Sequence, residues 1–136
     1  MSSQMIRNIF LVLVLIFSSP VNACGFFTGL FTTENASLDY VGAIEFGVPF
    51  QKNDFTNIPL SFTGGKWLLN SGIAFKKVKG KLQGNNINIT VQTCLASGGS
   101  QSQEQQITLK NLVPGDYNVN YINPNGNSVH VGKIKI

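Results

Sequence analysis

The chain has 136 residues, ten basic and six acidic side chains, a net charge of +4, and only 12% charged residues. A typical soluble domain is about 25% charged, so Asn, Gln, Ser, Thr and glycine carry an unusual share of the polarity here. This composition excludes a charged disordered tail, a coiled coil and a collagen-like repeat, and the length excludes a large multidomain enzyme.

The first residues predict an export signal. Arg7 precedes an unbroken apolar run from Ile9 to Phe17, and small residues follow as far as Ala23. This order is typical of a secretory signal peptide, whereas a membrane-spanning helix needs about 20 apolar residues. We therefore expect residues 1–23 to be cleaved as a signal peptide and residues 24–136 to form a single domain that is secreted or periplasmic.

The exported chain would begin at Cys24, and Cys94 is its only other cysteine. An even cysteine count outside the cytoplasm favours a disulfide, which would close a loop of about 70 residues and stabilise the fold by roughly 4 kcal/mol. The segment Val21–Gly25 also resembles a bacterial lipoprotein signal, in which a lipid is attached to the first cysteine, although Asn22 departs from that pattern. The alternative is therefore a lipid-anchored envelope protein, the one case in which we expect a membrane contact.

The first half of the exported chain predicts strands and turns rather than helices. Residues 37–46 fit either a short helix or a strand, and residues 66–69 continue as a strand after a Gly-Gly turn. Ile58, Leu60 and Phe62 alternate with polar or small residues, and Pro59 indicates that this strand is irregular or lies at a sheet edge.

Two strands change the parity of their apolar positions, and each change predicts a β-bulge. The first lies at Lys76–Lys77 and the second at Gly132–Lys133. Between them, clear alternation places Ile87, Ile89 and Val91 on one face of a strand and Asn88, Thr90, Gln92 and Cys94 on the other.

The rest of the chain continues the pattern. Ile107 and Leu109 are expected to point inward, Tyr117, Val119 and Tyr121 alternate with Asn118 and Asn120, and Asn123–Gly126 fits a tight turn. We count about seven or eight short strands, with turns every 8–12 residues. The sequence thus predicts an all-β fold, an antiparallel two-sheet sandwich of immunoglobulin-like type.

The segment Leu112-Val113-Pro114-Gly115-Asp116-Tyr117 resembles the corner that enters the penultimate strand of immunoglobulin-like and fibronectin type III-like domains, and similar corners occur in transthyretin-like surface modules. The resemblance implies a structural corner at Pro114, Gly115 and Tyr117, with the tyrosine hydroxyl bonded to backbone upstream. It implies an architecture and no function. The antibody pattern is not followed, because Trp67 does not lie between two suitably spaced cysteines. Because Cys94 falls on the polar side of its strand, a disulfide to Cys24 would clamp the N-terminal segment across the outside of a sheet.

Most catalytic chemistry lacks the residues it needs. His130 is the only histidine, and its neighbours Val129 and Val131 point it away from the core. One histidine and two cysteines do not make a usual zinc site, and Glu45 is the most interesting of six carboxylates yet fits a solvent-facing strand position. We expect no catalytic residues, no metal and no cofactor, and a small hydrolase is the remotest alternative.

The lysines offer a candidate ligand-binding face. Lys77, Lys79 and Lys81 follow the first bulge at alternate positions, about 7 Å apart, and could meet an acidic glycan or lipid head groups. Lysines also protect exposed edge strands from pairing, so a solvated edge is the competing explanation. A second candidate surface is rich in side-chain amides. One predicted strand contributes Asn86, Asn88, Thr90 and Gln92, and a later strand contributes Asn118 and Asn120.

Function follows from these features only in outline. Nucleic acid is not expected as a partner, because Arg7 is the only arginine and only Phe75 accompanies the lysines. We predict a secreted or periplasmic, non-catalytic module that binds a protein or a glycan. The alternative is a structural subunit or accessory of a surface fibre, with the aromatic segment Gly25–Phe31 as its assembly element.

Overall fold

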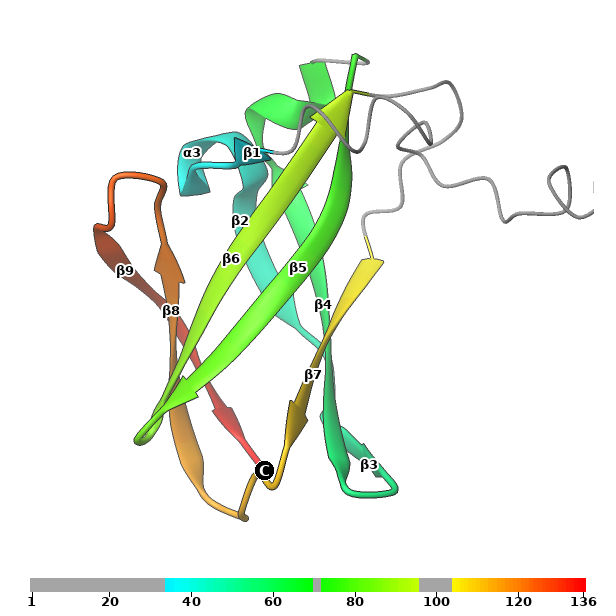
Figure 1. Cartoon of the computed structure of the whole chain (residues 1–136), viewed down its shortest axis with the longest axis vertical. Coiled ribbons are helices and arrows are strands. Elements are labelled where there is room, and N and C mark those ends of the chain that lie inside the picture. Colours follow the sequence, from blue (N-terminus) through cyan, green and yellow to red (C-terminus); the bar gives the residue numbers. More distant parts are fainter. Residues whose placement is uncertain (1–33, 70–71, 96–103) are drawn as a thin grey trace, which may run out of the picture.

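The computed structural model describes residues 34–69, 72–95 and 104–136. They form nine strands, a one-turn α-helix and a short 3-10 helix, and the strands make a five-stranded and a four-stranded sheet (Figure 1). The expected all-β two-sheet sandwich is confirmed. The expected signal peptide, the segment Gly25–Phe31 and Cys24 lie outside the described residues.

The five-stranded sheet is built around β6 (Asn86–Leu95). One edge of β6 pairs with β5 (Ile73–Gln83) along its whole length. The other edge pairs with β8 (Asp116–Ile122) and with the two-residue β1 (Glu34–Asn35), and β9 (Ser128–Lys135) lies outside β8. The β6–β8 pair is parallel, unlike the antiparallel pairing we expected throughout. The chain crosses to the other sheet between these two strands and returns, so they run in the same direction.

The four-stranded sheet is built around β4 (Phe55–Gly64). One edge of β4 pairs with β7 (Glu104–Lys110), and the other pairs with β2 (Gly42–Phe46) and then β3 (Phe50–Lys52). A one-turn helix, α3 (Leu38–Val41), precedes β2, so the segment that fitted helix or strand contains both.

The prediction for Lys66 was wrong. It begins the 3-10 helix η1 (Lys66–Leu69) and is not on a strand. Its ammonium forms an ion pair with Asp39 of α3 at the end of the molecule that carries both helices.

Pro59 lies on the central strand β4, so the edge position, one of the two alternatives that its residue type indicated, is wrong. Its carbonyl oxygen accepts a hydrogen bond from the amide of Gly47, 2.8 Å away, just where the neighbouring edge is broken between β2 and β3. The N–H and C=O of one strand residue point to the same side, so the N–H that proline lacks would face this break. A proline is therefore tolerated in the middle of the sheet.

The inward side chains of both sheets form one apolar cluster. Ring contacts at 4.9 Å join Phe75 of β5 to Phe62 of β4 and to Trp67 of η1. The core also contains the hydroxyl of Tyr121, which donates a 2.6 Å hydrogen bond to the carbonyl of Ala36. Most of the inward positions that alternation predicted are buried: Ile58, Leu60, Phe62, Ile87, Ile89, Val91, Ile107, Leu109, Tyr117, Val119 and Tyr121. The exceptions include Leu82 and Val129, apolar positions of the two bulged strands, which are 37% and 39% exposed.

Both predicted bulges are present. The register of β5 on β6 shifts between Phe75 and Lys77, as expected. The register of β9 on β8 shifts between the partners His130 and Gly132, so the extra residue is Val131, one position before the predicted site. Each bulge adds one residue, so the side chains that follow it lie on the opposite faces from those that the earlier alternation would give. The bulges therefore determine which of these side chains reach solvent.

Candidate binding face

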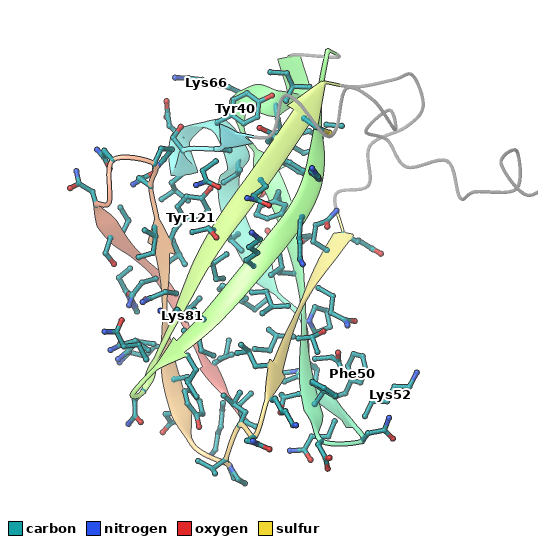
Figure 2. All side chains as sticks on the ribbon, in the orientation of Figure 1. Tyr40, Phe50, Lys52, Lys66, Lys81 and Tyr121 are labelled. Atoms are coloured by element: carbon teal, nitrogen blue, oxygen red, sulfur yellow. The ribbon has the colours of Figure 1, made fainter. Side chains whose placement is uncertain are left out.

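The lysines of β5 line the outer face of the five-stranded sheet. After the bulge, Val78 points into the core, and Lys77, Lys79 and Lys81 are exposed on the opposite side. Alternate residues of a strand lie about 7 Å apart, so the three ammonium groups form a regular row. Figure 2 shows Lys81 near the β5–β6 hairpin, away from Lys66 at the helix-bearing end.

The structure brings the two predicted surfaces together into one. In the β5–β6 register, Lys77, Lys79 and Lys81 lie opposite Gln92, Thr90 and Asn88, respectively. In the parallel β6–β8 register, Asn86 and Asn88 lie opposite Asn118 and Asn120. Together with Lys133 and Lys135 of β9, these side chains form a continuous outer surface. We call this surface the lysine–amide face.

The lysines of β9 complete this face, and the sequence pattern did not place them there. Ile134 is buried, so its neighbours Lys133 and Lys135 point outward, and Lys133 lies opposite Asn118. His130 is exposed as expected, with its Nδ1 3.4 Å from Oδ1 of Asn120. The parity change in the last strand indicates that these two lysines point outward. It does not indicate which sheet β9 joins, because that depends on pairing between distant segments.

The charge on the lysine–amide face is predominantly positive. Within the described ranges it carries one carboxylate, Asp116, opposite Lys135 at one end. None of its lysines forms an ion pair with another described residue, unlike Lys66, which pairs with Asp39 at the helix-bearing end. The lysines of the face occupy the two outer strands of the sheet and leave the neutral amides between them: Lys77, Lys79, Lys81, Lys133 and Lys135.

Cys94 lies on the outer side of its strand but is buried. It pairs with Ala74, and the next pair in the register contains the inward Phe75. The exposed fractions of Cys94 and Ala74 are only 2% and 1%, and the Cys94 sulfur lies 3.6 Å from the Ala74 carbonyl oxygen. The outward direction agrees with the sequence, whereas the burial does not follow from it. Since Cys24 is outside the described residues, the disulfide stays a prediction.

The predicted corner has a purely structural geometry. The hydroxyl of Tyr117 donates a 2.8 Å hydrogen bond to the carbonyl of Val113, four residues upstream. Gly115 also exchanges two backbone hydrogen bonds with Ile136, at 2.9 and 3.1 Å, which fastens the C-terminus to this corner. Pro114, Gly115 and Tyr117 therefore position β8 and do not contribute to the lysine–amide face.

Two carboxylates come together on the other sheet. Glu45 of β2 and Glu104 of β7 both lie opposite Ser61 of β4, on the outer face, and border a shallow depression of about 700 Å³. Glu104 begins β7. Glu45 is exposed as expected. The described residues include no group of three or more His, Cys, Asp or Glu side chains that could hold a metal ion.

The outer face of the four-stranded sheet differs in character from the lysine–amide face. Asn57 is 6% exposed, and its Oδ1 accepts hydrogen bonds from Nε2 of Gln106 at 2.7 Å and from Oγ1 of Thr108 at 2.9 Å. Phe50 and Phe55 are 47% and 42% exposed near the β3 turn, where Figure 2 shows Phe50 beside Lys52. This face is therefore a hydrogen-bonded network with an apolar margin.

The comparisons with known proteins identify no relative. No family model matches the chain, and neither a curated protein nor a solved structure is similar enough to count as a match. Separately, no helix among the described residues has the length and apolar character needed to cross a bilayer.

Proposed function

We propose that the protein is an exported, non-catalytic binding module whose lysine–amide face holds an acidic partner, a glycan or a protein, outside the cytoplasm. The observation that carries the proposal is the arrangement of charge. The five lysines of the lysine–amide face lie on the two outer strands of one sheet with one carboxylate among them, and none of the five forms an ion pair with another described residue. Unbalanced positive charge on an open face attracts anionic partners and raises the rate of their association.

Edge protection explains these lysines less completely. A lysine on an edge strand discourages pairing with another chain, and β5 and β9 are the outer strands of their sheet. However, the amides that join the two lysine rows lie on the inner strands β6 and β8, where there is no edge to protect. A binding role accounts for the lysines and the amides together.

Export is supported by the sequence of the first 23 residues, and the burial of Cys94 supports the disulfide to Cys24. A segment fastened across the outer face at Cys94 would cover that residue and Ala74, which agrees with their low exposure. A lipid on Cys24 is the alternative. Intact mass before and after reduction separates the two, because a disulfide adds two hydrogens on reduction and a lipid adds acyl chains.

We further propose that the sandwich is of immunoglobulin-like or transthyretin-like type. The Tyr117–Val113 hydrogen bond supports this assignment, because the same bond marks the corner of immunoglobulin-like domains. The parallel β6–β8 pair is a departure from sheets that are antiparallel throughout.

Binding to an acidic polysaccharide and to an acidic polypeptide tests the function, with polygalacturonate and polyglutamate as probes. The variant is Lys77→Ser, Lys79→Ser, Lys81→Ser, and the matched control removes the same charge elsewhere: Lys52→Ser, Lys66→Ser, Lys110→Ser. Each exposed charge contact contributes about 0.2–1 kcal/mol, so the face variant should bind roughly tenfold more weakly.

The control variant should bind as the wild type does. Wild-type binding should also weaken from about 0.01 M to 1 M salt, as the Debye length falls from about 30 Å to 3 Å. Equal losses in the two variants would show that net charge acts and not this face, and a wild type that binds neither probe would contradict the proposal.

A further inference from the structure

Two rows of side chains cross the lysine–amide face at right angles to the strands. Neighbouring strands lie about 4.8 Å apart, so each row spans about 14 Å from β5 to β9. The centre of both rows is a group of four asparagines, Asn86, Asn88, Asn118 and Asn120, which we call the amide quartet. The first row is Lys81, Asn88, Asn120 and His130, and the second is Gln83, Asn86, Asn118 and Lys133.

The amide quartet has hydrogen-bonding capacity that the protein does not use. Each asparagine side chain offers two N–H donors and an acceptor oxygen. Nδ2 of Asn88 donates to Oε1 of Gln83 at 3.2 Å, and Oδ1 of Asn120 lies 3.4 Å from the His130 ring. This leaves the Asn88 oxygen, the Asn120 amino group and the Asn86 and Asn118 side chains able to bind a ligand.

The combination of neutral amides and flanking cations selects a class of ligand. Amide groups match hydroxyls, which also both donate and accept hydrogen bonds, whereas lysines match carboxylates. The face has no Phe, Tyr or Trp side chain within the described ranges, because Tyr117 and Tyr121 point inward, and its one ring is the small imidazole of His130 on the outer strand β9. It therefore lacks the large aromatic surface on which a neutral sugar would stack. A ligand that carries hydroxyls and carboxylates in an extended chain satisfies both kinds of group.

We infer that the lysine–amide face binds a carboxylated polysaccharide, a chain that contains uronic acid units. The inference rests on the proposed function and adds the class of partner. The polysaccharide crosses the strands along the two rows, its hydroxyls on the amide quartet and its carboxylates at Lys81 on one side and Lys133 on the other. The affinity comes from many weak contacts along an extended ligand and not from a deep pocket.

The experiment measures the binding of polygalacturonate, polyglutamate and neutral dextran to the exported protein. The test variant is Asn88→Ala, Asn120→Ala, and the matched control replaces two exposed amides outside the face, Gln51→Ala, Asn127→Ala. We expect the test variant to lose about tenfold in affinity for polygalacturonate, as two hydrogen-bonding side chains warrant, and to bind polyglutamate as the wild type does. The control should retain both affinities, and circular dichroism should show that both variants are folded.

The outcomes distinguish this inference from the proposed function. Wild-type polyglutamate binding as tight as that of polygalacturonate, or a test variant that retains its affinity for polygalacturonate, would overturn the inference. The proposed function would then survive if the triple lysine variant still lost both polyanions. Tight binding of dextran by the wild type would overturn the inference as well, because carboxylates would not be needed.

Discussion

The two outer faces of this sandwich are both polar, yet they use their polar groups differently. On the four-stranded sheet, the oxygen of Asn57 is buried and receives two hydrogen bonds from neighbouring side chains. That face also carries both signs of charge, since Glu45 and Glu104 lie on it together with Lys110. At its centre, Asn57, Gln106 and Thr108 satisfy one another.

On the five-stranded sheet, several outer side chains have charges or hydrogen-bonding groups that the protein does not use. The five lysines of the lysine–amide face form no ion pair with another described residue, and the asparagines between them make few side-chain hydrogen bonds. Strand alternation makes both outer faces polar and therefore does not identify a binding site. Unbalanced charge and unused donors and acceptors distinguish one face from the other.

The largest difference in stability should come from a comparison of two phenylalanines, one on each side of the four-stranded sheet. Phe62 is fully buried and packs against the tilted ring of Phe75, so Phe62→Ala should lower the free energy of unfolding by about 3–5 kcal/mol. Phe50 is 47% exposed on the outer face, and Phe50→Ala should cost less than about 1 kcal/mol. Urea denaturation of both variants measures the difference, and similar losses would show that the outer face is also part of the core.

Gly80 tests how closely the lysine strand β5 approaches β7. A Cβ at this position would overlap with Cγ2 of Ile107, a buried β-branched side chain that has little freedom to move. Gly80→Ala should therefore destabilise the fold by about 1–3 kcal/mol. Lys79→Ala, on the solvent side of the same strand, is the control and should change the unfolding free energy by less than about 0.5 kcal/mol. A neutral Gly80→Ala would mean that the two sheets are farther apart at this point.

Tyr121 ties the five-stranded sheet to the segment before α3 and makes stability depend on pH. Tyr121→Phe removes its hydrogen bond to the buried Ala36 carbonyl and should cost about 1–2 kcal/mol at neutral pH. Burial raises the pKa of Tyr121 to about 12 from 10.0, so the folded state keeps the hydroxyl proton after the unfolded state has lost it. The free energy of unfolding is therefore unaffected below pH 10 and falls as the pH rises toward 12.

The Tyr121→Phe variant separates the titration of the Tyr121 hydroxyl from the other titrations at high pH. Tyr121→Phe should lose stability less steeply between pH 10 and 12 than the wild type, while Tyr40, whose pKa burial also raises, keeps its own contribution. Parallel stability curves for the wild type and Tyr121→Phe would contradict the buried position of this hydroxyl.

The smallest effect compares two asparagines on the two outer faces. Asn57→Ala leaves two donors without their shared acceptor and should cost about 1 kcal/mol. Asn120→Ala removes a half-buried amide with one long contact to His130 and should change stability by less than about 0.5 kcal/mol. Equal costs, measured by thermal unfolding, would remove the distinction between a satisfied network and a face with spare hydrogen-bonding capacity.

Local features of the fold could be predicted from the sequence. The parity change at Lys76–Lys77 produced a bulge, and the Asn123–Gly126 turn closes with a 2.9 Å hydrogen bond between its end residues. The Tyr117 corner also formed as its resemblance implied. Each of these depends on a few neighbouring residues, whose backbone preferences act without reference to the rest of the chain.

Features that depend on distant pairing could not be predicted. The parallel β6–β8 pair places Asn118 beside Asn86, and β9 adds Lys133 to the same face, although no local pattern says which strands are neighbours. The position of Pro59 on a central strand could not be predicted, because the break in the strand beside it is a tertiary feature. The candidate face was therefore recognised in separate pieces, and only the sheet order joined them.

The most direct test of the binding face is a titration of the isotope-labelled exported protein with polygalacturonate fragments, followed in ¹H–¹⁵N spectra. We predict chemical-shift changes at the side-chain amides of Asn88 and Asn120 and at the backbone amides of Lys79 and Lys133, with Asn57 and Gln106 unaffected. Changes confined to the four-stranded sheet, or a spectrum that does not respond to the ligand, would contradict the account.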